Sequence, residues 1–383
     1  MTPRRHGVST VAVHGPAERR PDWAPVAPSV VQSSTFTNPV GSDEEVLYSG
    51  YGNNPTQVAL ARKYAMLEGT EDAVFLASGS GATALALLAV LRPGDHLVSS
   101  DWIYGGSRQL FDQEFARLGI EVSYVRPDRV REWRKSMRKT TRAIFVETPT
   151  NPLIRVVDVR PVAALARNEG LALLVDATFA SPVNFRPTEA GADVVITSAT
   201  KYLNGHSDIV AGAVAGSLSF VEEVRGLMRI WGQAIDPHAA WLVDRGLRTL
   251  AIRMERHNAN GLAVARWAEK QRWVARVHYP GLDSHPDHEL ASEVLGGYGG
   301  MVGLELRGGP DAAQRLLSRL KLIIHAPSLG GVESLISEPR FTSHREIAPA
   351  ERERQGIPDG FLRLSCGIED ADDIIADLEQ AGR

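Results

Sequence analysis

The sequence predicts an α/β protein: a mainly parallel sheet covered by helices on both faces, followed by a smaller C-terminal α/β domain. Short apolar runs alternate with helical stretches over residues 73–196. A long, charged helical stretch then follows at residues 240–270, and isolated strands and helices come after it. Alternating strands and helices are typical of parallel sheets, because parallel neighbours need a crossover connection.

The apolar runs of the first part are short enough to be buried strands. They lie at residues 73–77, 96–99, 120–125, 143–146, 171–175 and 194–196. We expect helices at residues 57–67, 82–91, 108–118 and 159–168. The C-terminal block predicts strands at residues 303–306, 322–324 and 361–365, and helices at 312–320 and 371–378.

This pattern divides the chain into three parts. Residues 1–52 are rich in Pro, Gly, Ser and Thr and lack periodicity, so we expect an arm that contacts a neighbouring subunit. Residues 53–245 would form the large domain and residues 246–383 the small one.

Composition excludes several classes of protein. The chain has 383 residues, of which 43% are hydrophobic and 23% charged, as in an ordinary globular enzyme. Its net charge is −4 and its basic residues are scattered, which argues against a nucleic-acid partner. The N-terminus lacks an apolar signal region, and the run 82–91 is too short to span a membrane. The single cysteine, Cys366, excludes a disulfide framework, so we expect a cytoplasmic protein.

Ligands of parallel sheets bind beyond the carboxyl ends of the strands, so the residues that follow each apolar run are candidates for a site. Lys201 follows the run 194–196 and lies beside Ser198 and Thr200. Lysine is rarely buried without a partner. Lys201 is therefore either a surface residue that opens a loop or an amine that forms a Schiff base with an aldehyde cofactor or a carbonyl substrate.

A glycine-rich turn lies between the run 73–77 and the helix that follows. Gly79, Gly81 and Ala84 match the G-x-G-x-x-A variant of the dinucleotide fingerprint, and Asp101 supplies an acidic partner about 20 residues on. A nicotinamide-dependent dehydrogenase is therefore one alternative. The open amides of a helix N-terminus bind a single phosphate equally well.

Asp176 follows the apolar residues of the run 171–175. It is either a turn or capping residue or a semi-buried anion that keeps a heterocyclic nitrogen protonated. A phosphate anchor, a partner for a ring nitrogen and an amine together match what pyridoxal 5′-phosphate (PLP) requires. A dehydrogenase gives no role to Lys201, which favours PLP.

Long motifs over residues 48–369 resemble the Cys/Met-metabolism family of fold-type I PLP enzymes, most closely the cystathionine γ-lyases and γ-synthases. These motifs are SGSGATA (78–84), DWIYGGS (101–107), ETPTNP (147–152), VDATFASP (175–182), SATKYLNGHSD (198–208), RMERHNANG (253–261), YPGLDSHPDHELA (279–291), SLGGVESL (328–335) and RLSCGIED (363–370). The resemblance implies the fold-type I architecture, with a seven-stranded sheet in the large domain. It also implies PLP as the cofactor and a homotetramer built from two dimers.

The resemblance also implies roles for the residues that bind the cofactor. Lys201 would bond to the cofactor aldehyde and later carry a proton. The amides of Gly79 and Ser80, with the hydroxyls of Ser198 and Thr200, would hold the phosphate.

The resemblance also implies which residues contact the cofactor ring and the substrate. Asp176 would pair with the pyridine nitrogen, Tyr104 would stack on the ring and act as an acid–base group, and Asn151 would contact the 3′-oxygen. Arg363 would bind the substrate α-carboxylate, assisted by Ser328 and Asn151. The alternation of FLRLSCG supports this, because a guanidinium grips a carboxylate with two parallel bonds.

Two positions bear on the reaction. Glu333, a candidate substrate-binding residue, is similar to the cystathionine γ-lyase and γ-synthase pattern, and Gly106 stands where methionine γ-lyases commonly carry cysteine. We therefore predict γ-elimination of cystathionine or a related sulfur amino acid, giving a thiol, 2-oxobutyrate and ammonia. γ-Replacement on an activated homoserine, methionine γ-elimination and a PLP-carrying paralogue without activity stay open.

A possible metal motif is H-x-x-H at His285 and His288, with Asp287 between them. The stretch SHPDHEL reads better as a helix start, with Ser284 near the cap and Pro286 in the first turn. We therefore expect no metal.

The arm departs from the family pattern Y-S-R-x-G-N-P-T, in which Tyr and Arg reach a neighbour's cofactor phosphate. Tyr48 is kept, but Gly50 takes the place of the arginine. Losing a guanidinium removes a bidentate, charge-assisted phosphate contact. We predict that Gly50→Arg lowers the dissociation constant for PLP, measured by titrating the apoenzyme; an unchanged or higher constant would contradict this.

Overall fold

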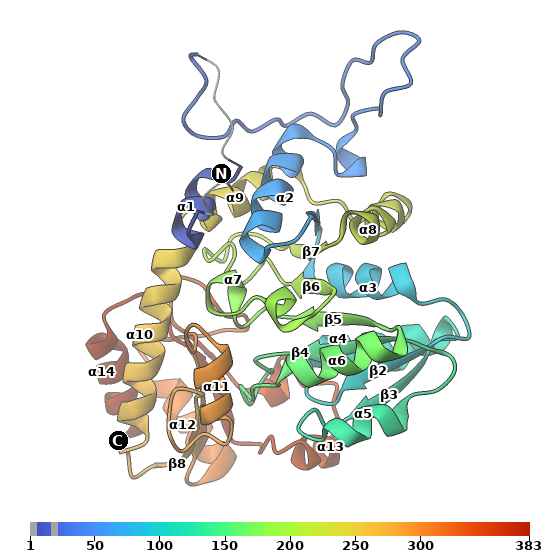
Figure 1. Cartoon of the computed structure of the whole chain (residues 1–383). Helices are drawn as coiled ribbons and strands as arrows, with labels where there is room; N and C mark the ends of the chain where they lie inside the picture. The colour runs from blue at the N-terminus through green and yellow to red at the C-terminus, as the bar shows by residue number, and fades with distance from the viewer. Residues whose placement is uncertain (1–5, 17–21) are drawn as a thin grey trace.

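The computed structural model describes residues 6–16 and 22–383. Within these residues, seven strands form the larger sheet (Figure 1). They are β1 (Asp72–Leu76), β2 (His96–Ser100), β3 (Glu121–Val125), β4 (Thr141–Glu147), β5 (Ala172–Asp176), β6 (Val194–Thr197) and β7 (Gly212–Gly216). Their order in the sheet is β1-β7-β6-β5-β4-β2-β3, and β7 runs antiparallel to its neighbours while the other pairs are parallel. The predicted fold class is confirmed.

Two layers of helix cover this sheet. The helices of this part of the chain are α1 (Val8–His14), α2 (Pro55–Glu68), α3 (Gly79–Val90), α4 (Gly105–Gln109), which continues as a π-helical turn (Leu110–Phe115), α5 (Val130–Ser136), α6 (Val159–Glu169), α7 (Ser181–Asn184), α8 (Leu218–Trp231), α9 (Pro237–Leu247) and α10 (Leu250–Ala268). Short 3-10 turns lie at Ser49–Tyr51, Pro187–Ala190 and Pro339–Phe341.

Alternate residues of each strand pack against different layers, as the period of two requires. On β1, Val74 and Leu76 pack with α3 and α8, whereas Phe75 packs with α2 and α9. On β4, Phe145 joins the α3 side and Ile144 joins the cluster of α5 and α6. The sheet is therefore buried on both faces, which explains its near-continuous apolar runs.

The C-terminal part contains the second sheet, for which the described residues supply five strands. These are β8 (Val274–His278), β9 (Met301–Leu306), β10 (Ile324–His325), β11 (Leu335–Ser337) and β12 (Phe361–Ser365), in the order β10-β11-β12-β9-β8. The remaining helices are α11 (His288–Val294), α12 (Gly309–Arg319), α13 (Pro349–Arg354) and α14 (Ala371–Gly382). Apolar residues of α10, α12 and α14 form one cluster with this sheet.

The predicted elements mostly coincide with those of the structure, but several bounds differ, and the helices α1, α5, α7, α8 and α13 were not predicted. The stretch 240–270 is two helices, α9 and α10, so the predicted domain boundary at residues 245–246 falls inside α9. The predicted helix 108–118 begins earlier, at Gly105, and includes the π-helical turn. The strands β7, β8 and β11 were not predicted; β7 reads GAVAG and has no bulky apolar residue beyond one valine.

Residues 22–52 run over one end of the molecule as an extended segment (Figure 1). Trp23 and Val40 on this segment are fully exposed. Before it, α1 packs on the main body through Val11 and Ala12. Among the described residues, no helix is long and apolar enough to cross a membrane.

A buried polar cluster lies beneath the carboxyl end of β6. The Tyr64 hydroxyl contacts Glu68 Oε1 at 2.8 Å and Thr197 Oγ1 at 2.9 Å. Glu68 is fully buried, and its Oε2 has no hydrogen-bond partner within the described part of the chain. Burial raises the pKa of Glu68 from 4.5 to about 7, so the folded state binds more protons than the unfolded state between these pH values.

The raised pKa of Glu68 predicts how the free energy of unfolding depends on pH. As pH rises from about 5 to 8, the unfolding free energy of the wild type loses about 3 kcal/mol through Glu68. Glu68→Gln cannot titrate, so its stability relative to the wild type should rise by about that amount. Urea unfolding at the two pH values measures the difference, and a difference that does not change with pH would contradict the prediction.

Candidate active site

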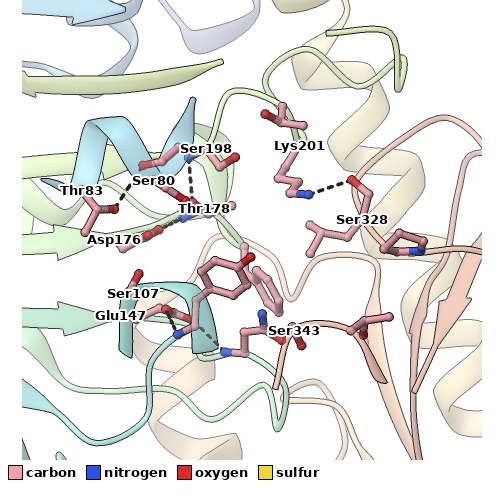
Figure 2. Close-up of a pocket in the computed structure, with 18 of the residues that line it drawn as sticks. Ser80, Thr83, Ser107, Glu147, Asp176, Thr178, Ser198, Lys201, Ser328 and Ser343 are labelled. Atoms are coloured by element: carbon pink, nitrogen blue, oxygen red, sulfur yellow. Dashed lines mark hydrogen bonds between the residues drawn. The ribbon is translucent and has the colours of Figure 1, made fainter. Parts of the chain in front are cut away.

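A cavity of about 500 Å³ lies at the carboxyl ends of β4, β5 and β6, where the two sheets approach each other (Figure 2). Most of the predicted site residues line it. They are Gly79, Ser80, Tyr104, Asn151, Asp176, Ser198, Thr200, Lys201, Ser328 and Arg363. Tyr48 and Glu333 do not line this cavity.

One end of the cavity is the N-terminus of α3. Ser78 caps this helix by accepting a hydrogen bond from the Gly81 amide at 3.0 Å. The first amides of a helix have no partner inside the helix, and the helix dipole makes this end positive. A Cβ atom on Gly79 would lie 2.8 Å from Ser198 Oγ, so only glycine allows the two segments to approach this closely. The arrangement suits a phosphate group.

Asp176 ends β5 beside this helix terminus. The Thr178 amide donates to Asp176 Oδ1 at 2.9 Å, and Thr178 Oγ1 accepts from the Ser198 amide at 2.9 Å. Burial raises the pKa of Asp176, and the hydrogen bonds from Thr178 oppose that rise. A buried carboxylate of this kind stabilises a cation such as a protonated pyridine nitrogen.

Lys201 faces the cavity from the turn that follows β6. Its Nζ donates to Ser328 Oγ at 2.7 Å. Burial first, and then the positive charge of Arg363, lower the pKa of Lys201 to about 8. Near neutral pH a useful fraction of the amine is therefore neutral and able to act as a nucleophile or a base. The surface-loop interpretation of Lys201 is wrong.

Arg253 stabilises the turn that carries Lys201. The guanidinium donates to the carbonyls of Tyr202 at 2.8 Å, Leu203 at 3.3 Å and Gly246 at 2.8 Å. Sequence reasoning did not single out Arg253, because these partners are backbone atoms that only the fold brings together.

Arg363 enters from β12 of the second sheet. Its Nη1 donates to Asn151 Oδ1 at 2.8 Å and its Nη2 donates to the Ser328 carbonyl at 3.1 Å. Its Nε has no partner among the described residues, and none of their carboxylates forms an ion pair with it. Burial lowers the pKa of Arg363 to about 10, so the group stays charged near neutral pH and suits a substrate carboxylate.

Tyr104 precedes α4 and lies in the cavity with its side chain partly exposed. Its amide donates to Glu147 Oε2 at 2.7 Å. A Cβ atom on Gly106 would lie 2.4 Å from Cε1 of the Tyr104 ring. The missing side chain at position 106 therefore permits this ring position.

Two predicted residues lie elsewhere. Tyr48 packs edge-on against Tyr51, with 5.1 Å between ring centroids, and Glu333 accepts a hydrogen bond from Ser207. A Cβ atom on Gly50 would lie 2.8 Å from Tyr48 Cε1. An arginine at position 50 therefore requires the Tyr48 ring to shift, and its 41% exposure leaves room for this.

Two weaker motifs have other partners. Asp101, the acidic residue of the dinucleotide alternative, pairs with Arg108 at 3.0 Å and does not line the cavity. Asp287 accepts two hydrogen bonds from Arg155, and α11 begins at His288, so the predicted cap at Ser284 is wrong. Across residues 6–16 and 22–383 no group of three or more His, Cys, Asp or Glu could hold a metal.

The cavity also contains residues that sequence reasoning missed. Besides Glu147 and Thr178, they include Ser107, Phe179, Phe341, Thr342 and Ser343. Glu147 had a usable signal, because it directly follows the apolar run 143–146 as Asp176 follows the next run. The segment 341–343 follows no strand of the larger sheet and carries no such signal.

Comparison with known proteins identifies the family. The model of the Cys/Met metabolism PLP-dependent enzymes matches residues 9–382. The chain belongs to this family. PLP is therefore its cofactor, and the helix terminus at Gly79, the carboxylate of Asp176 and the amine of Lys201 fit the phosphate, ring nitrogen and aldehyde of that group. The nicotinamide alternative is wrong.

Family members that are similar to the chain have different names. The chain is 43% identical over 379 residues to cystathionine gamma-synthase of Mycobacterium bovis, covering 98% of this chain and 96% of the relative. It is 39% identical over 392 residues to L-methionine gamma-lyase of Fusobacterium nucleatum subsp. polymorphum, covering 99% of each. A crystal structure of cystathionine gamma synthase from Xanthomonas oryzae pv. oryzae, in complex with aminoacrylate and cysteine, has a TM-score of 0.94 at 37% identity and covers 98% of this chain and 97% of that one. The protein is thus a PLP-dependent enzyme of sulfur amino acid metabolism.

Proposed function

We propose that the protein catalyses γ-elimination of cystathionine or a related sulfur amino acid, releasing a thiol, 2-oxobutyrate and ammonia. The contact between Lys201 and Ser328 carries the proposal. Ser328 accepts from the Lys201 amine through its hydroxyl at 2.7 Å and from Arg363 through its carbonyl at 3.1 Å. One residue thus fixes a base relative to the group suited to the substrate carboxylate.

Bound PLP supplies an electron sink for negative charge at the substrate Cα. In this proposal Arg363 binds the α-carboxylate and so orients Cα toward Lys201. The amine of Lys201 removes the Cα proton, for which its pKa of about 8 is well matched. γ-Elimination also needs a proton to be removed from Cβ, and the flexible side chain of Lys201 suits a base that serves both carbons.

Gly106 favours cystathionine over methionine as the substrate, because methionine γ-lyases commonly carry cysteine at this position, and the names of some relatives support the γ position. A side chain at position 106 would displace the ring of Tyr104, which lies beside the substrate amine in the proposed arrangement. Relatives of 43% and 39% identity carry names that refer to γ chemistry, and other relatives of 39% identity are named cystathionine beta-lyase. Because the first of these is a synthase, γ-replacement on an activated homoserine is the second candidate, and methionine γ-elimination is the third.

We further propose a homotetramer of two dimers, in which the arm of one subunit reaches the site of its neighbour. The arm and α8 expose large apolar side chains in the single chain, which is typical of a surface that is covered in an assembly. They are Trp23, Val26, Val40, Ile230 and Trp231. Light scattering should give four times 41.6 kDa, about 166 kDa, and the mass of a monomer or a dimer would contradict the proposal. The buried single thiol of Cys366 is compatible with a cytoplasmic location.

A substrate panel tests the reaction. We expect purified enzyme to convert cystathionine to 2-oxobutyrate faster than methionine, homocysteine or O-acyl-homoserines, with little pyruvate. Lys201→Ala is the control and should abolish product formation, since it removes the base. Pyruvate as the main product would indicate β-elimination, and turnover of O-acyl-homoserine only with an added thiol would indicate γ-replacement.

A further inference from the structure

We propose that Glu147 is a positioning residue, which fixes Tyr104 and Asn151 and, through Asn151, the guanidinium of Arg363, while leaving Arg363 free for substrate. The inference rests on the proposal that the cavity binds an amino acid by its carboxylate. It does not depend on which sulfur amino acid reacts.

Glu147 ends β4, directly opposite Asp176 in the register of β4 with β5. It lines the cavity, and 4% of its surface is exposed. Each carboxylate oxygen accepts one backbone amide: Oε2 from Tyr104 at 2.7 Å and Oε1 from Asn151 at 2.8 Å (Figure 2). The two oxygens of one carboxyl group therefore hold both segments.

The two amides belong to segments that are distant in sequence. Tyr104 precedes α4, whereas Asn151 lies in the turn after β4. One side chain therefore fixes the distance between the ring of Tyr104 and the amide side chain of Asn151. Asn151 Oδ1 in turn accepts a hydrogen bond from Arg363 at 2.8 Å. By fixing Asn151, Glu147 therefore also fixes the position of the Arg363 guanidinium.

The absence of an ion pair on Arg363 fits the same role. Burial lowers the pKa of Arg363, and Tyr104, Tyr202 and Glu147 oppose this effect. Burial and the nearby Asp176 raise the pKa of Glu147 well above its ordinary value, although the two amides and Arg363 oppose the rise. In the described part of the chain, Glu147 and Arg363 form no ion pair that the substrate carboxylate would have to displace.

The competing explanation is that Glu147 has only a structural role. A variant of a second buried carboxylate distinguishes the two explanations. Asp377 is also buried and accepts hydrogen bonds from the amides of Lys321, Leu322 and Ile323 at 2.8–2.9 Å, and it does not line the cavity. Asp377→Asn therefore removes a buried carboxylate that holds backbone amides but no residue of the site.

The experiment measures binding of glycine to the PLP-loaded enzyme by the change in cofactor absorbance. Glycine carries the α-carboxylate but has no side chain to eliminate, so its binding does not depend on the proposed reaction. Glu147→Gln loses the charge and at least one amide bond, and we expect glycine to bind about ten-fold more weakly or worse. Glu147→Asp keeps the charge and should recover part of this loss. Asp377→Asn should lower the thermal midpoint but leave glycine binding within about two-fold of the wild type.

Glycine binding by Glu147→Gln within about two-fold of the wild type would overturn the proposal, as would an equal loss in Asp377→Asn. If Glu147→Gln does not fold, Glu147→Asp decides. Its shorter side chain cannot keep both amide bonds at their present lengths, so unchanged glycine binding would then contradict the positioning role. Normal glycine binding with no turnover of any sulfur amino acid would count against the proposed reaction alone.

Discussion

The partly buried amine of Lys201 is the constraint on which the rest of the site depends. A lysine removed from water favours its neutral form, and the positive charge of Arg363 adds to this effect. Arg363 is also buried, and no described carboxylate forms an ion pair with it. Other polar groups must therefore stabilise its charge. Asn151 and the Ser328 carbonyl accept hydrogen bonds from the guanidinium and so stabilise it. The same burial that makes Lys201 reactive thus requires the polar framework around it.

The fold brings these groups together from separate parts of the chain. Parallel β4, β5 and β6 end at one edge of the sheet and deliver Glu147, Asp176 and the turn with Lys201. The second sheet contributes Arg363 from β12, and Ser328 precedes β11. The cofactor groups therefore come from the larger sheet and the carboxylate-binding groups mainly from the smaller one. A cavity between the two sheets is where a cofactor and an amino acid can meet.

Much of this could be predicted from the sequence, for a physical reason. Buried parallel strands produce apolar runs, and a polar residue just after such a run marks the functional edge of the sheet; this found Asp176 and Lys201. The π-helical turn, the short β11 and the glycine-rich β7 carry no such signal. Glu147 follows such a run and could have been found in the same way, whereas Arg253 acts through backbone atoms of distant segments, which no local pattern encodes. Likewise, the choice between elimination and replacement depends on how the substrate side chain lies in the cavity.

The most direct test of the account is to find the lysine that carries the cofactor. Borohydride reduction of the PLP-loaded enzyme, followed by digestion and mass spectrometry, should place a phosphopyridoxyl group on Lys201. The visible absorbance of the purified protein should also be lost in Lys201→Ala. A label on any other lysine, or no label at all in a protein that absorbs in the visible, would contradict the assignment of Lys201 at the end of β6 as the centre of the site.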